Sequence, residues 1–206
     1  MTAPRYWKGA ARELATRDAV LKKLVTQFKG LALGSRGDAF QTLARAIVGQ
    51  QISVKAAQSV WNRFAAEVQT VSPAAVHCLD TQRLRGCGLS GQKAGYLLDL
   101  AGRFHSGALD PGNWQQLDDE TLIAELIQVK GIGRWTAEMF LIFYMTRPNV
   151  LPLADIGLQR AMSLHYNKGK PLTRSKMLKI GDSWAPWRSV ATWYMWRSLD
   201  PLPVEY

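Results

Sequence analysis

Two features of this sequence could act together chemically: a glycine turn and a carboxylate that follows it. Gly131-Ile132-Gly133 joins two segments that read as helices, and Asp155 opens the next helical run after Pro152. A glycine turn that leads into a helix N-terminus gathers backbone N–H groups into a small anion site. Lys130 and Arg134 flank the turn and add positive charge. We therefore expect a protein that grips a nucleic-acid backbone and does chemistry beside it.

The two glycines are expected to permit a positive φ and a close backbone approach that larger residues would block. The amides of the helix that follows would then point outward at a phosphate oxygen. A Gly-x-Gly between helices can also be a plain turn that binds nothing. The neighbouring Lys130 and Arg134 favour the binding interpretation.

Asp155 has two physically distinct candidate roles. An aspartate directly before a helix can cap it by accepting hydrogen bonds from free amides. An ionised carboxylate can also stabilise an oxocarbenium-like sugar and orient or deprotonate a water molecule. Cap contacts and the helix dipole would keep this carboxylate ionised at neutral pH. Both roles can coexist in one side chain.

The overall charge favours a polyanionic partner. The chain has 206 residues, with 26 Lys and Arg against 16 Asp and Glu, for a formal net charge of +10. Such a balance promotes binding to nucleic acid through counterion release and steering, although solvated lysines of an ordinary basic protein would give the same excess. With 47% hydrophobic residues, the chain is globular rather than disordered.

Cysteine usage excludes common metal motifs. Cys78 and Cys87 are the two cysteines, and no His or Cys lies at ligand spacing from them. This excludes a zinc finger and the four-cysteine set of an iron–sulfur cluster, and it fits a reducing cytoplasm. Residues 1–18 contain no apolar signal core, and the longest apolar run, 139–145, is too short to span a bilayer. We expect an intracellular protein with no membrane association.

Helical periodicity dominates the chain and few stretches alternate with period two, so we expect an all-α fold. Asp38 can cap one helix, and Asp118-Asp119-Glu120 places negative charge at the start of another. Chain breaks are expected at 86–91, 107–115 and 146–149. The expected helices cover residues 10–28 with Asp18 as a possible cap, 39–48, 53–68, 93–104, 122–129, 134–145, 155–166, and about 174–184 and 187–198.

The glycine turn resembles the helix–hairpin–helix of the DNA glycosylase superfamily, in which a Gly/Pro-rich loop and an Asp follow the hairpin. Residues 130–141, Lys-Gly-Ile-Gly-Arg-Trp-Thr-Ala-Glu-Met-Phe-Leu, are similar to the alkylated-base branch, 3-methyladenine DNA glycosylase II. The resemblance covers nearly the whole chain. It includes Tyr6-Trp7 with Leu14 and Asp18, 44–57 with Gly49-Gln50-Gln51-Ile52-Ser53, Gly88-Leu89-Ser90, Lys93-Ala94, Asp99-Leu100-Ala101 and Trp184-Ala185-Pro186-Trp187-Arg188.

The resemblance implies one glycosylase domain, 1–206, of two helical lobes with the active cleft between them. One lobe would hold about 1–38 with 147–206, and the middle lobe about 39–146, with the helix–hairpin–helix at 120–146. Longer bacterial relatives carry an additional N-terminal β-domain. This chain is expected to be the short form, without that β-domain.

The resemblance also implies roles for individual residues. Asp155 would assist loss of the base, which must first be flipped out of the helix, and Trp135, Met139 and Trp196 would form the base pocket. Most of the eight tryptophans are nevertheless expected in the core. The DNA contacts would come from Gln51, Lys130, Gly131, Gly133, Arg134 and Thr136. Carbonyls of Ile127, Val129 and Ile132 would hold a monovalent cation, Na+ or K+.

Two of these residues carry further interpretation. Bifunctional relatives have a lysine where this chain has Trp135, and that amine attacks the sugar and leads to strand cleavage. A tryptophan cannot do so, which implies a monofunctional enzyme. Gln51 lies where relatives insert a wedge into the duplex. In one interpretation Gln51 fills the space left by the flipped base and hydrogen-bonds to the orphan base. In the other it is an ordinary surface glutamine.

The resemblance therefore implies a monofunctional glycosylase of base excision repair. It would excise alkylated purines such as 3-methyladenine and 7-methylguanine from damaged double-stranded DNA, as a monomer in the bacterial cytoplasm at the nucleoid. No cofactor for chemistry and no iron–sulfur cluster are expected. One alternative is a non-catalytic helix–hairpin–helix module, which leaves Asp155 unexplained. Another is a glycosylase for oxidised or mismatched bases, against which the missing lysine and the absent cluster cysteines weigh.

Overall fold

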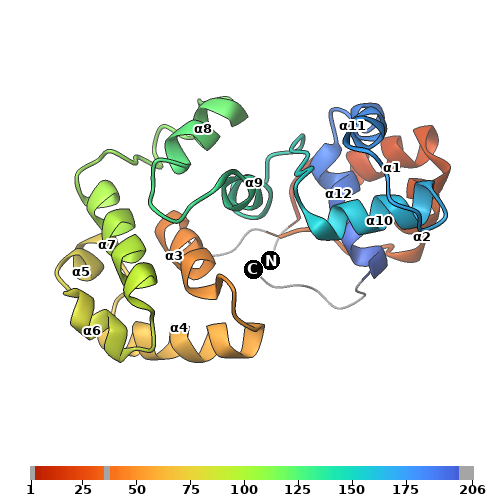
Figure 1. Cartoon of the computed structure of the whole chain (residues 1–206). Coiled ribbons are helices and arrows are strands. Elements are labelled where there is room, and N and C mark those ends of the chain that lie inside the picture. The colour runs from red at the N-terminus through yellow and green to blue at the C-terminus, as the bar shows by residue number, and fades with distance from the viewer. Residues whose placement is uncertain (1–2, 35–37, 200–206) are drawn as a thin grey trace. The chain divides into compact units, whose positions relative to one another are not determined.

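The structure is a computed structural model that describes residues 3–34 and 38–199. These residues form twelve α-helices and no β-strand, which confirms the all-α prediction (Figure 1). In order, they are α1 (Trp7–Arg17), α2 (Ala19–Gln27), α3 (Ala39–Gly49), α4 (Val54–Val68), α5 (Pro73–His77), α6 (Thr81–Gly86), α7 (Gly91–His105), α8 (Asp119–Leu126), α9 (Arg134–Phe143), α10 (Ile156–Tyr166), α11 (Arg174–Ser183) and α12 (Arg188–Leu199). Across these two described ranges, no helix combines the length and the apolar character needed to cross a bilayer.

The chain forms two compact units. Among the described residues, unit 1 contains 3–34 and 141–199, and unit 2 contains 38–140. The boundary between them falls inside α9, so Trp135 and Met139 belong to unit 2 while Phe143 belongs to unit 1. Each unit has its own core and is described by itself.

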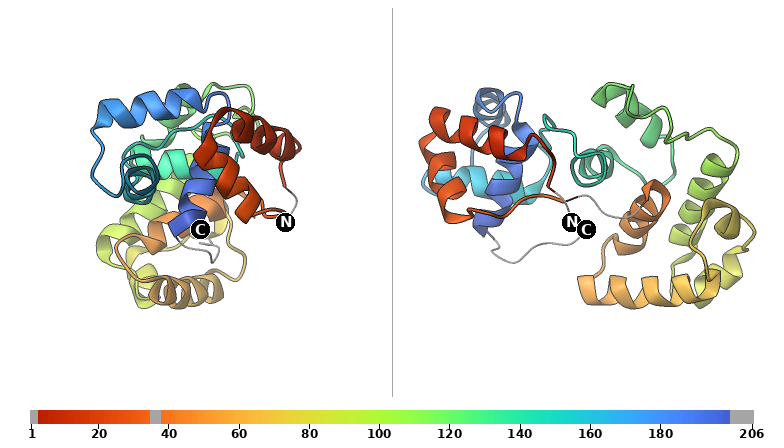
Figure 2. Two further views of the ribbon diagram at one scale, coloured as in Figure 1. Left: turned by 90° about the vertical axis from the view of Figure 1, so that its right-hand side faces the viewer. Right: turned by 180° about the vertical axis from the view of Figure 1, so that it is seen from behind.

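Unit 1 is built around α12. Residues 189–195 of this helix are all buried, so it is enclosed on every side rather than amphipathic. It packs against α1, α2 and α10, and Figure 2 shows this group of helices from two further sides. The largest core side chains of the unit include Leu14, Leu21 and Trp184, each almost fully buried.

Asp18 separates the first two helices, where the periodicity suggested one helical run. Its extended backbone ends α1, and its Oδ1 accepts hydrogen bonds from the amides of Val20 and Leu21, which caps α2. Its Oδ2 accepts a hydrogen bond of 2.7 Å from the Tyr166 hydroxyl on α10. Burial raises the pKa of Tyr166, and the bond to Asp18 raises it further. One carboxylate thus joins three helices of unit 1.

Unit 2 is organised by α7, which packs against α3, α5 and α6. Leu97 and Leu100 of α7 are fully buried against a core that includes Phe64 and Leu84. Helices α5 and α6 were not expected, because five or six residues are too few to show a helical period. Their caps, Ser72 and Asp80, accept hydrogen bonds from helix amides and are the signal that marks them.

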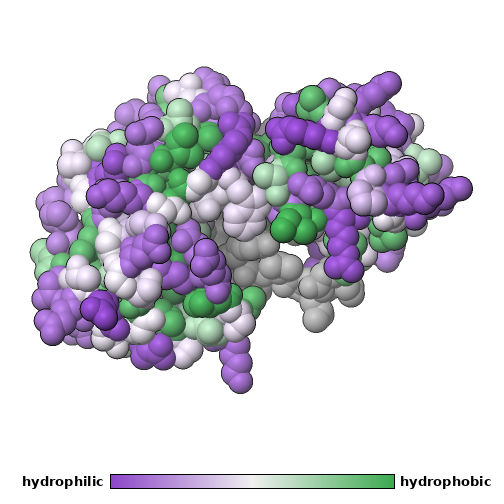
Figure 3. Space-filling view, in the orientation of Figure 1, coloured by the Kyte–Doolittle hydropathy of each residue, from purple (hydrophilic) through white to green (hydrophobic). Residues whose placement is uncertain are grey.

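Figure 3 shows hydrophilic side chains over much of the visible surface, with separate apolar patches between them. Several large apolar side chains in the described part of the chain are more than a third exposed. Those beside predicted site residues are Ile52, Val54, Ile127, Trp135 and Ile156, of which Ile156 is 80% exposed.

Candidate active site

Asp155 is the N-cap of α10. Its Oδ1 accepts a hydrogen bond of 2.6 Å from the Leu158 amide, so the expected capping role is confirmed. The same oxygen accepts a second hydrogen bond, of 2.7 Å, from the indole Nε1 of Trp196. The Asp155 side chain is buried, with 8% of the residue exposed. Two N–H donors therefore fix the orientation of a buried carboxylate.

Trp196 holds this carboxylate from α12. Its indole stacks on the ring of Phe143, with centroids 5.6 Å apart and an interplanar angle of 12°. Trp196 was expected in a base pocket, and the hydrogen bond from its N–H to Asp155 was not predicted from the sequence. The stacking and the hydrogen bond together leave the indole little freedom to rotate.

Gly157 provides the room for this pair. A Cβ at position 157 would lie 3.1 Å from Asp155 Oδ1 and 3.3 Å from Trp196 Cδ1, closer than ordinary packing allows. Gly157 and Phe143 were both missed by the sequence analysis. The small residue two positions after the carboxylate was an available signal, whereas the stacking of Phe143 requires the tertiary structure.

The predicted hairpin lies between α8 and α9. Helix α8 ends at Leu126 rather than at Val129, and the Ile132 amide donates to the Val129 carbonyl at 3.0 Å to close the turn. Gly131 has a φ of +83°, and a Cβ there would overlap the ring of Tyr96 on α7. Glycine is therefore required at Gly131 by the fold itself.

The expectation of a positive φ at both glycines of the turn is wrong for Gly133. Its φ is not positive, and a Cβ at position 133 would meet nothing within 4 Å. The space in front of it is open. The glycine at this position is not explained by the conformation or packing of unit 2, and it leaves room for a close approach from outside.

The N-terminus of α9 supplies the expected amides. Its first intrahelical hydrogen bond is donated by Ala137 to the Gly133 carbonyl at 3.0 Å. The amides of Gly133, Arg134 and Thr136 precede that bond, in the first turn, where amides have no intrahelical acceptor. Thr136, in the first turn of α9, is buried, with 9% of the residue exposed. A phosphate facing these amides would also meet the positive end of the helix dipole.

The two basic residues of the turn differ in their surroundings. Arg134 donates to Glu120 on α8 at 2.9 and 2.5 Å and to Glu138 at 3.0 Å. The hydrogen bonds with Glu120 raise the pKa of this guanidinium and lower that of the Glu120 carboxyl. Arg134 thus joins the two helices of the hairpin, and this structural role was not predicted from the sequence. Its contact with DNA stays a prediction. The Lys130 side chain is exposed, and its amide donates to Asp99 Oδ2 at 2.9 Å.

The three carbonyls predicted to bind a cation lie in this turn. Backbone bonds from Gln128 and Val129 close onto Glu125 and Leu126 at the end of α8. The next amide, that of Lys130, is directed to Asp99 instead of to Ile127, which leaves the Ile127 carbonyl at the negative end of the helix dipole. Together with the carbonyls of Val129 and Ile132, the donor set consists of neutral oxygens. Such a set suits a monovalent cation.

Gln51 lies in the loop between α3 and α4. It is exposed and has a φ of 57°, the left-handed region that residues other than glycine rarely adopt. Its neighbour Gln50 donates from Nε2 to the Gly131 carbonyl at 2.8 Å. The structure therefore joins the predicted wedge loop to the predicted hairpin within unit 2.

The remaining predicted pocket residues lie on one face of α9. Trp135 and Met139 are one helical turn apart, with Trp135 40% exposed and Met139 buried. They belong to unit 2, whereas Asp155 and Trp196 belong to unit 1. A common base pocket for the three aromatic and apolar side chains stays a prediction.

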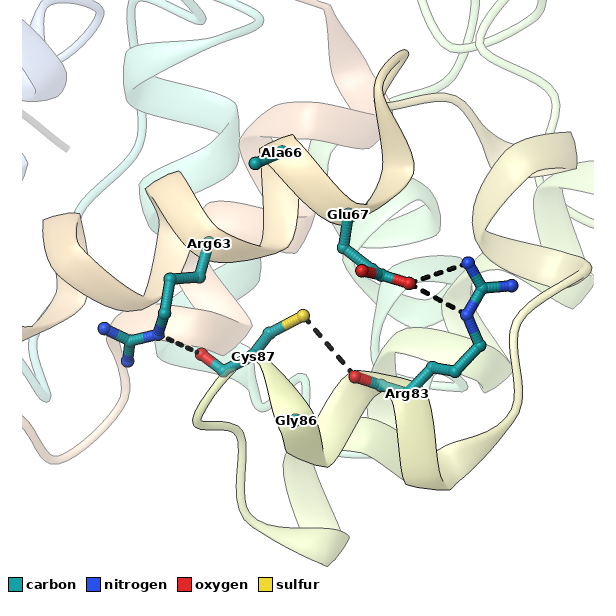
Figure 4. Close-up of a pocket in the computed structure, with 6 residues that line it drawn as sticks. All are labelled: Arg63, Ala66, Glu67, Arg83, Gly86 and Cys87. Carbon is teal, nitrogen blue, oxygen red and sulfur yellow. Dashed lines mark hydrogen bonds and ion pairs between the residues drawn. The ribbon is translucent and has the colours of Figure 1, made fainter.

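A hollow of about 530 Å³ elsewhere in unit 2 contains none of the predicted site residues. It is lined by Arg63, Ala66, Glu67, Arg83, Gly86 and Cys87 (Figure 4). Arg83 pairs with Glu67, and Arg63 Nε donates to the Cys87 carbonyl at 2.8 Å. Burial raises the pKa of the Cys87 thiol, which disfavours the reactive thiolate. These contacts fasten α4 to α6 and do not indicate a second reactive site.

Comparison with known proteins gives consistent matches. Residues 44–186 match the HhH-GPD superfamily of base excision DNA repair proteins. DNA-3-methyladenine glycosylase 1 of Schizosaccharomyces pombe is 33% identical over 182 residues, which cover 86% of this chain and 80% of that protein. The crystal structure of DNA-3-methyladenine glycosidase from Bacillus halodurans is 30% identical, with a TM-score of 0.88 over 97% of this chain and 93% of that one. The Schizosaccharomyces pombe 3-methyladenine DNA glycosylase in complex with abasic DNA is 31% identical, with a TM-score of 0.80 over 96% of this chain and 99% of that one.

Proposed function

Because this chain belongs to the HhH-GPD superfamily of base excision DNA repair proteins, and to its 3-methyladenine DNA glycosylase branch, we propose that it excises alkylated purines from double-stranded DNA. The substrates would include 3-methyladenine and 7-methylguanine, and the product would be an abasic site. The observation that carries this proposal is the buried carboxylate of Asp155, held by the Leu158 amide and the Trp196 indole. A DNA-binding module without chemistry would need Asp155 only as the cap of α10, and this leaves the second hydrogen bond, from the Trp196 indole, unexplained.

The proposed reaction is hydrolysis of the N-glycosidic bond. The bond between C1′ and the base nitrogen breaks and its electron pair leaves with the base, so a cationic alkylated purine departs as a neutral molecule. The Asp155 carboxylate would stabilise positive charge on the sugar and orient the water whose oxygen bonds to C1′. The proton lost by that water passes to the carboxylate or to solvent. Flipping would bring the nucleotide to the carboxylate.

The hairpin would supply affinity that does not depend on sequence. The amides of Gly133 and Thr136 at the start of α9, with that of Gly131 in the turn, would face a phosphate, and a net charge of +10 favours attraction to DNA. Na+ or K+ on the carbonyls of Ile127, Val129 and Ile132 would add positive charge beside that phosphate. Replacing NaCl or KCl by a tetramethylammonium salt at equal ionic strength should then weaken DNA binding. Equal binding in all three salts would count against the cation.

Two finer properties belong to the same proposal. Trp135 stands where an attacking lysine would be needed, so the enzyme would lack lyase activity. We also propose that it acts as a monomer. A pocket of Trp135, Met139 and Trp196 would favour cationic bases, because an electron-rich ring attracts positive charge by roughly 1–2 kcal/mol.

The decisive experiment is release of free base from methylated duplex DNA, separated by chromatography. Release of 3-methyladenine or 7-methylguanine supports the proposal. If the protein binds DNA but releases no base from any methylated duplex, the non-catalytic module is the better account. Duplexes that contain an oxidised or a mismatched base are assayed in parallel, and release from these duplexes alone would favour the other alternative.

A further inference from the structure

We propose that Lys93 of α7 is a positioning residue that sets the conformation of the loop carrying Gln51. The proposal rests on the proposed function, since the loop matters only if it enters DNA. It adds a residue for which the sequence analysis gave no task beyond its resemblance to the family.

Lys93 caps the C-terminus of α3 from a different helix. Its Nζ donates to the carbonyls of Val48 and Gln50, each at 2.7 Å. These oxygens lie in the last turn of α3 and at its C-cap, where carbonyls lack intrahelical donors and the helix dipole is negative. A cation at this place satisfies two such carbonyls at once. Burial lowers the pKa of Lys93, so these two bonds compensate for the partial loss of water around the charge.

Gln51, the residue that follows these two hydrogen-bonded carbonyls, has an unfavourable backbone conformation. Gln51 directly follows Gln50 and has a φ of 57°, which is unfavourable for a residue with a Cβ. The loop also borders a hollow of about 340 Å³ lined by Gln50, Gln51, Ile52, Val60 and Lys93, among others. Apolar packing therefore does not fill that side of the loop. The polar contacts of Lys93, and of Gln50 with Gly131, hold it in place.

The same face of α7 also supports the hairpin. Tyr96 lies against Gly131, and Asp99 Oδ2 accepts the Lys130 amide at 2.9 Å. Lys93, Tyr96 and Asp99 are spaced by three residues and so lie along one side of the helix. One rigid helix thus fixes the distance between the loop of Gln51 and the glycine turn. Two elements that must contact one DNA duplex together need such a common support.

The test compares Lys93→Met, which keeps the length of the stem, with Lys93→Arg, which keeps the charge and two donors. Lys179→Met, at an exposed position of α11 in unit 1, controls for loss of one positive charge. Single-turnover base release at saturating enzyme should fall by about tenfold in Lys93→Met, stay within about twofold in Lys179→Met, and recover largely in Lys93→Arg. Circular dichroism should show the same helix content in all variants.

A double-mutant cycle separates positioning from general support. If Lys93 acts through Gln51, Lys93→Met should add less than about twofold to the defect of Gln51→Ala. The Lys93→Met defect should also shrink when the lesion faces an abasic analogue, because no orphan base then needs a partner. Full additivity, or an equal defect on both duplexes, would overturn the proposal.

Hydrogen exchange tests the same inference without any activity. Lys93→Met should raise amide exchange in a peptide covering residues 48–53 and leave residues 81–86 of α6 unchanged. If exchange at 48–53 does not rise, the inference fails even if the enzyme is active. If exchange rises but the wild-type protein releases no base, the positioning of the loop stands and the proposed function fails.

Discussion

Replacing Trp196 by Phe would test how the protein uses its buried carboxylate. The substitution keeps a ring that can stack on Phe143, and it removes the N–H that donates to Asp155 Oδ1 at 2.7 Å. A hydrogen bond to a charged group contributes about 1.5–3 kcal/mol. If that amount serves to orient the carboxylate in the transition state, base release should fall by about ten- to hundredfold. The Leu158 amide remains on the same oxygen, which favours the lower end of this range.

The chain offers a matched control at Trp187. Its indole Nε1 donates to Glu13 Oε2 at 2.6 Å, also in unit 1 but not at Asp155. Trp187→Phe removes one bond of the same chemical kind. By the same estimate Trp196→Phe should lose up to about 1.5–3 kcal/mol of stability, and Trp187→Phe should lose less, because the Glu13 side chain is 39% exposed whereas Asp155 is buried. Only Trp196→Phe should lose base release.

The assay is single-turnover release of 7-methylguanine and of hypoxanthine, with DNA affinity measured by fluorescence anisotropy. Orientation of Asp155 acts on the sugar, so Trp196→Phe should slow both bases by the same factor. Trp196→Ala also removes the ring and should reduce release of the cationic base more than that of the neutral one. The reasoning is refuted if Trp196→Phe stays within about threefold of wild type, or if Trp187→Phe is equally slow.

The remaining predictions concern the carboxylate, the glycines and the absent lysine. Asp155→Asn should nearly abolish base release while Tm and DNA affinity persist, because an asparagine still caps α10; retained activity within about tenfold would show that another group does the chemistry. Gly131→Ala should destabilise the protein by more than about 1 kcal/mol in thermal unfolding, because of its positive φ and the ring of Tyr96. Gly133→Ala should leave Tm unchanged and weaken binding to modified and unmodified DNA alike, and a loss confined to modified DNA would contradict a phosphate contact. Borohydride should trap no covalent complex with DNA, and product strands should break only after alkali; a trapped adduct would mean that another lysine attacks the sugar.

The sequence predicted the helices wherever local signals were sufficient. Asp38 and Ser53 each precede an apolar period and cap α3 and α4 as such residues commonly do. Asp18 interrupts one long period, and only the structure shows that the cap starts a new helix there. Helices α5 and α6 are too short for periodicity to be seen. Local chemistry thus explains most of the helices and their limits.

The candidate site was less predictable because its contacts join distant parts of the chain. Asp155 could be singled out from its position before a helix, but its bond with Trp196 joins α10 to α12. The pairing of Arg134 with Glu120 across the hairpin could not be predicted from the sequence either. It gives Arg134 a structural role in joining α8 to α9, besides the predicted contact with DNA. Gly133 shows the opposite case, since neither the fold of unit 2 nor its packing explains the glycine. We expect the glycine at position 133 to be explained by the approach of DNA rather than by the fold.

The position of α12 has a consequence for how the polypeptide folds as it is synthesised. Unit 2 is continuous in sequence, so its helices can assemble as soon as residues up to 140 have left the ribosome. Unit 1 combines α1 and α2 with α12, and its centre is made last. At about 5–20 residues per second, the apolar side chains of α1 and α2 would wait on the order of ten to thirty seconds for that helix. During that interval Trp7, Leu14 and Leu21 have no completed core, and nascent chains should bind hold-type chaperones through this segment until α12 emerges.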